Sequence, residues 1–379
     1  MNTRGQTVRV GTRGSNLALR QAAAVKETLE GRWLSVDLVE VETRGDQIRD
    51  ELIHRLGTTG AFVRALDEKV LSGELDAAVH SMKDVPTDQP DELVVAGIPE
   101  RGPAADLLVT PNGGGVGDLP EGATVGTSSL RRGAQLLAER PDLGIEPLRG
   151  NVDTRVEKHL APSLQREHEQ RLAADGDNGD GSASESGDSD ADDAPAFDRP
   201  VGEWFDGLSE VERRALERDV DTVYNAICLA EAGLERAGLL RHVPHHRLDP
   251  AAFVPAPGQG TLAVTAVDGD LAEQFHGVLD HPPTRVAATV ERTVLAELGG
   301  GCVAPIGVHA RLKGEVVSTA VRVLSQDGTE EVAATRDLPV ERHVETARAL
   351  AADLADRGGA DLIERARRDQ PDGPKRSDE

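Results

Sequence analysis

The chain has 379 residues, which is enough for two or three domains of ordinary size. It carries 67 acidic and 42 basic residues, a formal net charge of −25, and only 6 of the basic residues are lysine. An acidic surface repels nucleic acid and anionic membranes, so the composition argues against both as partners. No apolar run is long enough to span a membrane, and residues 1–10 lack the apolar core of a secretory signal. We therefore expect a cytoplasmic protein.

Two explanations compete for the acid excess. One is adaptation to high salt, where screening removes the self-repulsion of the surface. The other is an acidic docking protein. We favour the first, because an acid excess with so few lysines resembles a solvation pattern more than a binding site. A fold that melts when salt is removed would support it.

Strand and helix patterns alternate through the first hundred residues. Apolar or alternating strand runs are followed by helical spacing, which predicts an α/β domain with a largely parallel sheet. The expected strands are Thr7–Val10, Ser35–Glu42, Asp76–Val79 and Leu93–Ile98, and the expected helices are Asn16–Leu29 and Ala61–Leu71.

A second alternation begins after the polar break at Pro99–Pro103 and predicts a second α/β domain. Its expected strands are Asp106–Thr110, Thr124–Gly126, Ile145–Leu148 and Val223–Leu229, and its expected helices are Ser129–Glu139 and Val152–His159.

An acidic insertion interrupts the second domain from about 161 to 219. Its centre, Asp175–Asp198, has nine acidic residues and no basic one, so it cannot bury enough apolar surface to offset its ordering entropy. We expect a disordered surface loop between short helical arms at Glu167–Ala174 and Leu208–Arg218, the second with a capping-box pattern. A functional acidic tether is the alternative.

The pattern changes from Pro282 onward and predicts a small α+β domain. The expected elements are a helix at Thr284–Leu298, strands at Gly307–Leu312 and Val316–Leu324, and a helix at Val340–Arg357. The final dozen residues are polar, and we expect them to be frayed.

Two strand-to-helix turns, Gly11–Asn16 and Gly126–Arg132, present backbone N–H groups and hydroxyls as anion sites do. Serine and threonine are also common helix caps, which is the simpler explanation. Arginines gather at these and neighbouring strand ends, at Arg13, Arg131, Arg132, Arg149 and Arg155. A cation in the first turn opposes the helix dipole, and arginine binds carboxylates with two parallel hydrogen bonds. The group indicates a ligand with several carboxylates, although any single arginine could equally pair with an acidic residue.

Lys83 and Asp84 follow the predicted strand 76–79 at its carboxyl end, where open α/β sheets bind ligands. Asp84 could transfer a proton or hold a developing cation, with Lys83 favouring the ionised carboxylate. An exposed ion pair is the alternative. We interpret His80 as a structural residue.

The two cysteines differ in their surroundings. Cys228 lies in the apolar run 226–229, which is typical of an inert core residue. Cys302 lies between three glycines and a Val-Ala-Pro sequence, which describes an accessible loop. A thiol presented in this way suits a nucleophile, a redox site or a covalent attachment point. Two cysteines make no disulfide framework, and we predict no metal site.

These residues together resemble the hydroxymethylbilane synthase family, whose members are also called porphobilinogen deaminases. The segments that carry the resemblance follow the family's order: Gly11–Gln21, Thr43–Asp46, Gly60–Thr87, Val125–Gln135, Leu148–Arg155, Ala226–Gly238, Pro255–Gly260 and Glu291–Gly307. The resemblance implies two α/β domains like the lobes of type II periplasmic binding proteins, followed by a small α+β domain. We place these domains at 1–102 with 258–280, at 103–257, and at 281–379.

The resemblance also implies a chemistry. Cys302 matches the family's cysteine, which holds a dipyrromethane cofactor through a thioether. Four porphobilinogen molecules are then joined head to tail with loss of ammonia, and water releases linear hydroxymethylbilane. Asp84 matches the catalytic aspartate, which would stabilise the cationic azafulvene formed when ammonia leaves. Asp46 falls in the family's flap. We expect a monomer.

The remaining matches would contact the carboxylates and rings of the cofactor and substrate. The expected cofactor contacts, besides Cys302 and Asp84, are Lys83, Thr127, Ser129, Arg131, Arg132 and Arg155. The expected substrate contacts are Arg13, Ser15, Phe62, Arg149, Arg155, Arg236 and Gln259. Each pyrrole carries an acetate and a propionate, which would account for arginines in so acidic a protein.

The competing interpretation is a two-lobed carboxylate-binding or anion-binding protein without catalysis, such as a solute receptor. Such a protein would need no Cys302 and would need export, for which no signal is visible. We therefore prefer the enzyme.

Overall fold

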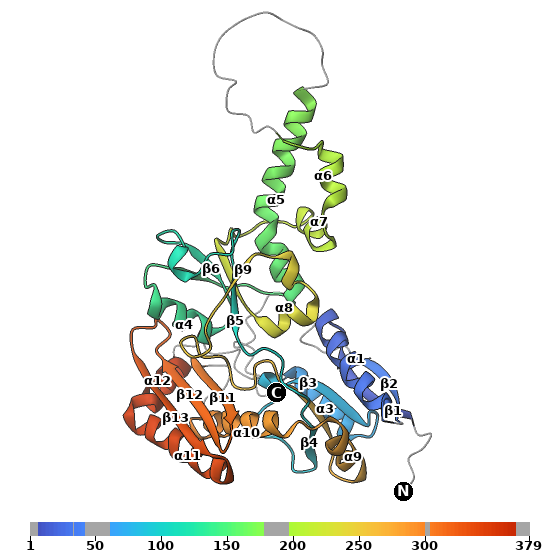
Figure 1. Cartoon of the computed structure of the whole chain (residues 1–379), viewed down its shortest axis with the longest axis vertical. Coiled ribbons are helices and arrows are strands. Elements are labelled where there is room, and N and C mark those ends of the chain that lie inside the picture. The colour runs from blue at the N-terminus through green and yellow to red at the C-terminus, as the bar shows by residue number, and fades with distance from the viewer. Residues whose placement is uncertain (1–6, 33, 42–60, 178–196, 300–303, 369–379) are drawn as a thin grey trace, which may run out of the picture.

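The computed structural model describes residues 7–32, 34–41, 61–177, 197–299 and 304–368. Within them the strands form two five-stranded sheets and one three-stranded sheet (Figure 1). The predicted pair of α/β domains followed by a small α+β domain is confirmed. No helix in these ranges is both long and apolar enough to cross a membrane.

The first sheet has the strand order β2-β1-β3-β10-β4. Its strands are β1 (Thr7–Arg13), β2 (Ser35–Val41), β3 (Ala77–Ser81), β4 (Leu93–Gly97) and β10 (Leu262–Val267), with helices α1 (Asn16–Glu30), α3 (Ala61–Leu71) and α9 (Asp270–Leu279). Strands β2 and β3 pair with β1 in parallel, whereas β10 runs antiparallel to β3 and β4. Val10, Leu29 and Phe275 are fully buried where the helices pack on the sheet.

The second sheet has the order β7-β6-β8-β5-β9. Its strands are β5 (Asp106–Val109), β6 (Thr124–Gly126), β7 (Gly144–Glu146), β8 (Ala226–Ala230) and β9 (His245–Arg247), with helices α4 (Leu130–Glu139), α5 (Val152–Asp177) and α8 (Glu231–Ala237). Here β6 pairs in parallel with β7 and β8, and β5 is the antiparallel strand. The two sheets therefore share one topology, that of the type II lobes which the resemblance implied.

Two crossing segments join the lobes, residues 99–105 and residues 249–260. They lie side by side, since the Gly102 N–H donates to the Gly260 carbonyl at 3.1 Å. Gly260 has a φ of +83°, and a Cβ there would come within 2.7 Å of the carbonyl oxygens of Gly102 and Pro103. Only glycine permits this approach, so the sequence at this position keeps the two crossings in contact.

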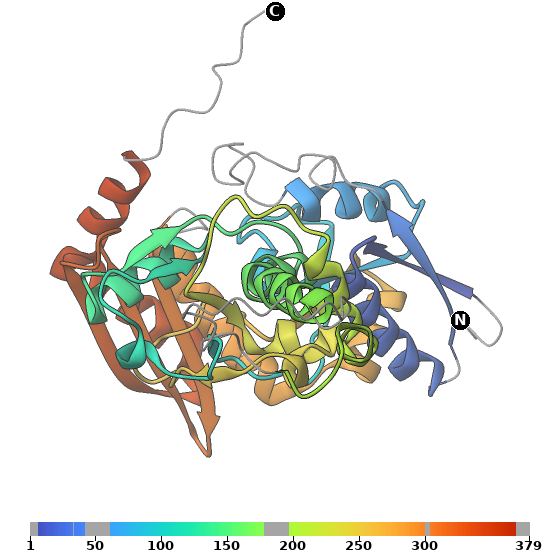
Figure 2. The same cartoon turned by 90° about the horizontal axis from the view of Figure 1, so that it is seen from above.

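The third sheet is an antiparallel meander of β11 (Ile306–Lys313), β12 (Val316–Leu324) and β13 (Glu331–Pro339). Helices α10 (Pro282–Glu297), α11 (His343–Leu354) and α12 (Ala360–Arg368) complete this domain. Val290, Val308 and Leu350 are fully buried in its core. Figure 2 shows this sheet and the first sheet on opposite sides of α5.

The insertion differs from its expected form. Helix α5 does not stop near 159 but runs through Pro162 to Asp177, and α6 (Val201–Gly207) and α7 (Glu210–Leu216) pack against it as a projecting arm (Figure 1). Arg171 lies over the rings of Phe197 and Trp204, at 4.2 and 5.2 Å from their centroids. These contacts order both flanks. The two predicted helical arms are confirmed, since Glu167–Ala174 lies within α5 and α7 lies within Leu208–Arg218, but the expected helix end near 159 was wrong. Residues 178–196 lie outside the described ranges.

Most other element boundaries agree with the predictions to within a few residues. Strand β1 is longer than expected because Gly11 does not end it. A Cβ on Gly11 would come within 2.4 Å of a Leu75 methyl group, so this glycine serves close packing of the sheet and not a turn. The patterns missed α6, α8, α9, α12, β9, β10 and β13. The capping box of α7 is confirmed by the Ser209 N–H donating to Glu212 at 2.7 Å.

Candidate active site

Asp84 lies at the carboxyl end of β3, in a single 3₁₀ turn formed by Met82–Asp84. Met82 is buried and its N–H donates to the Thr261 carbonyl at 2.9 Å, which anchors the turn to the second crossing segment's end. The Asp84 carboxylate is 45% exposed and accepts a hydrogen bond from the Lys83 ammonium at 2.6 Å. The fold thus presents this ion pair to ligands at the edge of the sheet.

His80 lies in β3, four residues before Asp84, and its side chain is buried. Its Nε2 lies 2.9 Å from Asp67 and 3.1 Å from Thr265, and the Thr265 hydroxyl donates to the same Asp67 oxygen at 2.9 Å. The three side chains tie α3, β3 and β10 together. The interpretation of His80 as structural is confirmed.

Arg131 and Arg132 open α4 and share one buried carboxylate, Asp106. Arg131 donates to one Asp106 oxygen at 2.7 Å, and Arg132 donates to the other at 2.9 Å. Burial alone would raise the pKa of Asp106, but the charges and hydrogen bonds of the two guanidiniums outweigh it and lower that pKa. Arg131 also donates to the Val254 carbonyl at 2.8 Å, so the pair is fixed to the second crossing segment.

A second group of arginines adjoins this pair. Arg155, in the first turns of α5, donates from Nε to the Gly150 carbonyl at 2.8 Å. Burial, followed by the positive charges of Arg132 and Arg149, lowers the pKa of Arg155 to about 10. Arg132 and Arg149 are therefore close enough to Arg155 to repel its charge, which the binding of an anion would relieve.

The predicted hydroxyl groups serve as local caps. Ser15 accepts from the Ala18 N–H at 3.2 Å, and Ser129 accepts from the Arg132 N–H at 3.4 Å. Thr127 is buried and accepts from the Ser129 N–H at 3.2 Å. The simpler explanation of Ser15 and Ser129 as N-caps is confirmed, and a ligand contact from these hydroxyls stays a prediction.

The first lobe meets the second at the turn that carries Arg13 and Ser15. Asn16, at the start of α1, donates to Asp153 of α5 at 3.4 Å, and Arg20 donates to the Arg236 carbonyl at 3.5 Å. The helix starts of α1 and α5 therefore lie together. This contact brings the turn that carries Arg13 close to the start of α5, beside Arg149 and Arg155, although these arginines lie more than 130 residues after Arg13 in the sequence.

Arg236 and Gln259 instead hold the crossing segments. The Arg236 guanidinium donates to the Gly260 carbonyl at 2.6 Å. The Gln259 amide donates to Ala104 at 2.7 Å and to Asp106 at 3.0 Å, and its side chain is almost completely buried. Their predicted substrate contacts stay predictions, while these bonds show that both side chains tie the crossing segments together.

Three predicted residues cannot be placed. Cys302 and Asp46 lie outside the described residues, and of Phe62 only its backbone in the first turn of α3 is described. Helix α10 ends at Glu297, so the chain enters the cysteine segment directly from that helix.

Sequence reasoning missed two carboxylates that organise the site. Asp106 begins an apolar strand and is fully buried, a placement that charged residues adopt only when paired. Glu291 is also fully buried and binds Arg101 through both oxygens, at 2.7 and 3.2 Å. The adjacent Arg131 and Arg132 indicate that an acidic partner exists. They do not indicate which of the 67 acidic residues it is.

The donors of this site fit a dipyrromethane bearing several carboxylates. Arg155 lies close to two other positive charges. The buried Nε of Arg131 has no hydrogen-bond partner among the described residues. Within the same ranges no three His, Cys, Asp or Glu side chains are grouped to hold a metal ion. The unpartnered Arg131 donor and the positive charges beside Arg155 suit a polyanionic organic group.

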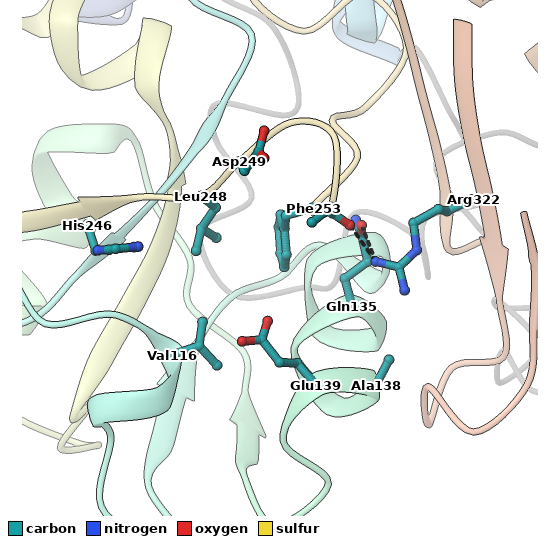
Figure 3. Close-up of a pocket in the computed structure, with 10 residues that line it drawn as sticks. Val116, Gln135, Ala138, Glu139, His246, Leu248, Asp249, Phe253 and Arg322 are labelled. Carbon is teal, nitrogen blue, oxygen red and sulfur yellow. Dashed lines mark hydrogen bonds between the residues drawn. The ribbon is translucent and has the colours of Figure 1, made fainter. Parts of the chain in front are cut away.

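A separate pocket of about 370 Å³ lies between α4, the second crossing segment and β12. Figure 3 shows the Glu139 carboxylate directed into it between Val116 and Phe253, with Arg322 at its rim. Arg322 donates to Gln135 at 3.2 Å and to the Ala252 carbonyl at 2.6 Å. None of the predicted site residues lines this pocket, which is therefore distinct from the predicted site.

The two type II lobes, the arginine group and the Lys83–Asp84 pair define a two-lobed α/β protein whose charges suit a polycarboxylate. A family model described as "Porphobilinogen deaminase, dipyromethane cofactor binding domain" matches residues 8–166 and 209–274. A second, described as "Porphobilinogen deaminase, C-terminal domain", matches residues 286–357.

Individual proteins agree with these models. A probable porphobilinogen deaminase of Halobacterium salinarum is 53% identical over 96% of this chain and 98% of its own length. A porphobilinogen deaminase of an Exiguobacterium species is 36% identical over 93% of this chain and 97% of its own length. Among solved structures, lipoprotein Tp32 of Treponema pallidum reaches a TM-score of 0.34 at 13% identity, covering 72% of this chain and 88% of that one, which is too weak to support an argument.

The chain belongs to the porphobilinogen deaminase family. The similarity to a Halobacterium protein also agrees with the acid excess, so the composition is that of a halophilic protein.

Proposed function

We propose that this chain is a hydroxymethylbilane synthase, a transferase that joins four porphobilinogen molecules head to tail, releases ammonia at each step, and frees linear hydroxymethylbilane by hydrolysis. The observation that carries the proposal is the mutual crowding of Arg132, Arg149 and Arg155. A carboxylate bound beside Arg155 would relieve the repulsion from its two neighbours, and a polypyrrole with acetate and propionate side chains supplies several carboxylates.

The residues near this charge have distinct tasks in the reaction. Arg13, Arg149 and Arg155 bind the carboxylates of incoming porphobilinogen and hold the reacting carbons in line. The Asp84 carboxylate hydrogen-bonds pyrrole N–H groups and stabilises the cation that forms on porphobilinogen when ammonia leaves. The Lys83 ammonium donates a hydrogen bond to the Asp84 carboxylate at 2.6 Å and so places a positive charge beside it.

The proposed cofactor is one dipyrromethane on Cys302, contacted by Lys83, Asp84, Thr127, Ser129, Arg131, Arg132 and Arg155. When bound, it supplies the pyrrole α-carbon to which the first substrate is joined. Ser15, Phe62, Arg236 and Gln259 complete the proposed substrate contacts. We assign residues 1–102 with 258–280, 103–257 and 281–379 to three domains of a cytoplasmic monomer.

Mass spectrometry tests the proposal through the two cysteines. The purified protein should be heavier than its sequence by two pyrrole units, and Cys302→Ala should lose both this increment and turnover. Cys228→Ala is the matched control, because Cys228 is fully buried and burial raises the pKa of its thiol to about 12, which makes it unreactive. It should keep the increment.

Two outcomes would contradict this function. A fully active protein without added mass would remove the covalent cofactor from the mechanism. A protein that binds carboxylated ligands but neither carries the increment nor consumes porphobilinogen would instead be the non-catalytic binding protein.

The acidic insertion should be dispensable for turnover. Replacing residues 178–196 by a short glycine-serine linker leaves the packed arm in place, including the Asp175 oxygen that accepts from the Val201 N–H at 2.9 Å. We expect kcat and KM to stay within about twofold of the parent, since surface changes away from a site have small effects. Steady-state rates at equal salt measure this, and a collapse of kcat would show that the segment serves catalysis.

A further inference from the structure

Helix α10 of the third domain reaches the Asp84 turn. We propose that Arg292 on this helix is a positioning residue for Asp84, holding the backbone that orients the carboxylate; the proposal rests on the catalytic role proposed above for Asp84. It gives the domain that carries Cys302 a direct hold on the catalytic turn in the first lobe.

The contact is made by both arms of the guanidinium. Arg292 Nη1 donates to the Val85 carbonyl at 2.8 Å, and Nη2 donates to the Pro86 carbonyl at 2.7 Å. These two carbonyls follow Asp84 directly in the chain. A planar guanidinium fixes the relative orientation of two acceptors, which a flexible ammonium does not.

The charge of Arg292 has no carboxylate partner among the residues that the structure describes. Within the described ranges no carboxylate forms a salt bridge with it, and burial lowers its pKa. A half-buried cation without a carboxylate partner carries a desolvation cost. Its hydrogen bonds to the Val85 and Pro86 carbonyls are therefore the interactions that offset this cost.

The neighbouring residue, Glu291, braces the other side of the same turn. One of its oxygens accepts from the Gly258 N–H at 2.6 Å. Gly258 has a φ of +74°. A Cβ there would lie 2.8 Å from the Met82 Cγ and 3.2 Å from the Lys83 backbone nitrogen. The second crossing segment is thus pressed against the residues that precede Asp84, while Arg292 holds those that follow it.

Bracing from both sides matters because the carboxylate itself has little support. Asp84 is 45% exposed and its side chain bonds to Lys83, the adjacent residue in the same turn. Nothing in that pair fixes the direction of the turn as a whole. Stabilising a developing charge requires a preorganised group, and a displacement of about 1 Å can cost about 100-fold in rate.

The test compares two arginines of α10. Arg285 lies two helical turns before Arg292 and also donates to a first-lobe carbonyl, that of Val95, at 3.1 Å, but in β4 and not in the Asp84 turn. We expect Arg292→Gln to lower kcat by about 10- to 100-fold with KM unchanged and the two-pyrrole mass increment retained. Arg285→Gln should keep the parent kcat, and Arg292→Lys should recover part of the loss.

A double-mutant cycle with Asp84→Asn then separates positioning from general stability. If Arg292 acts through the Asp84 carboxylate, adding Arg292→Gln to Asp84→Asn should not lower the single-turnover rate further. Rate losses that multiply, an unchanged kcat in Arg292→Gln, a raised KM, a lost mass increment, or an equal loss in Arg285→Gln would each overturn the proposal.

The two proposals fail in different ways. If Asp84→Asn keeps its activity, the catalytic role of Asp84 is wrong and the positioning role falls with it. If Asp84→Asn is inactive while Arg292→Gln is normal, only the positioning role is wrong. If Arg292→Gln does not fold, Arg292→Lys is the deciding variant. A lysine retains the charge but has a single donor nitrogen, so this variant should still show a reduced kcat at the parent KM.

Discussion

Asp84→Asn should lower kcat by about 100-fold or more, the loss measured when a group that stabilises transition-state charge is removed. The amide keeps the shape of the side chain but lacks its negative charge. That charge stabilises the cation that is left on porphobilinogen when ammonia departs. Because Asp84 is almost half exposed and bonded to Lys83 alone among the described side chains, the folded state should be little affected. Product formation and thermal unfolding, measured on the same preparations, separate the two effects.

Asp88→Asn provides the matched control for that substitution. Asp88 is exposed and follows Asp84 by four residues, so the same chemical change is made in the same loop. It should leave kcat near the parent value. Equal losses in both variants would mean that the loop as a whole matters and that the charge at Asp84 has no special role.

Asp106→Asn should give a large loss of stability. Its two oxygens are the partners of Arg131 and Arg132 in a fully buried network. Removing one partner of a buried ion pair leaves uncompensated charge and costs about 3–5 kcal/mol. Urea unfolding at constant high salt should show a lower midpoint with an unchanged slope.

The pH dependence of this difference has a definite sign. The pKa of Asp106 is lowered in the folded protein, so the carboxylate contributes stability above its unfolded pKa of about 4 and loses that contribution as pH falls through the lower folded value. The parent and the Asp106→Asn variant should therefore differ by a constant amount near neutrality and converge in acid. A difference that grew with acidification would contradict this assignment.

Asp142→Asn is the control for stability. Asp142 pairs with Arg140 through two hydrogen bonds at 2.7 Å, the same geometry as a buried pair, but at the surface. Water and salt screen such a pair, so its removal should leave the unfolding midpoint nearly unchanged.

The main outline of the fold could be predicted because it depends on local patterns. Alternating strands and helices indicated the two lobes, and most boundaries moved by only a few residues. The exceptions depend on tertiary contacts. Helix α5 continues past Pro162 because Arg171, Phe197 and Trp204 stack along it, and two of those residues are more than 25 positions away in the sequence. No local signal reports such a contact.

The site divides in the same way. Lys83 and Asp84 were identified because the end of a buried strand is a local feature. Arg236 and Gln259 were chosen by motif position, and in the structure they hold the crossing segments. The roles of Asp106 and Glu291 depend on partners brought together from distant segments, which the motif order alone does not reveal.

The burial of Asp106 with its two arginines divides the protein's electrostatics into two regimes. In about 1 M salt the screening length falls to about 3 Å, so exposed pairs such as Arg365 with Glu330 lose most of their attraction. Asp106 is fully buried and its two arginines are nearly fully buried, so salt screens this network much less. A rise in ionic strength therefore weakens the interactions between exposed charges much more than the interactions among the buried Asp106, Arg131 and Arg132.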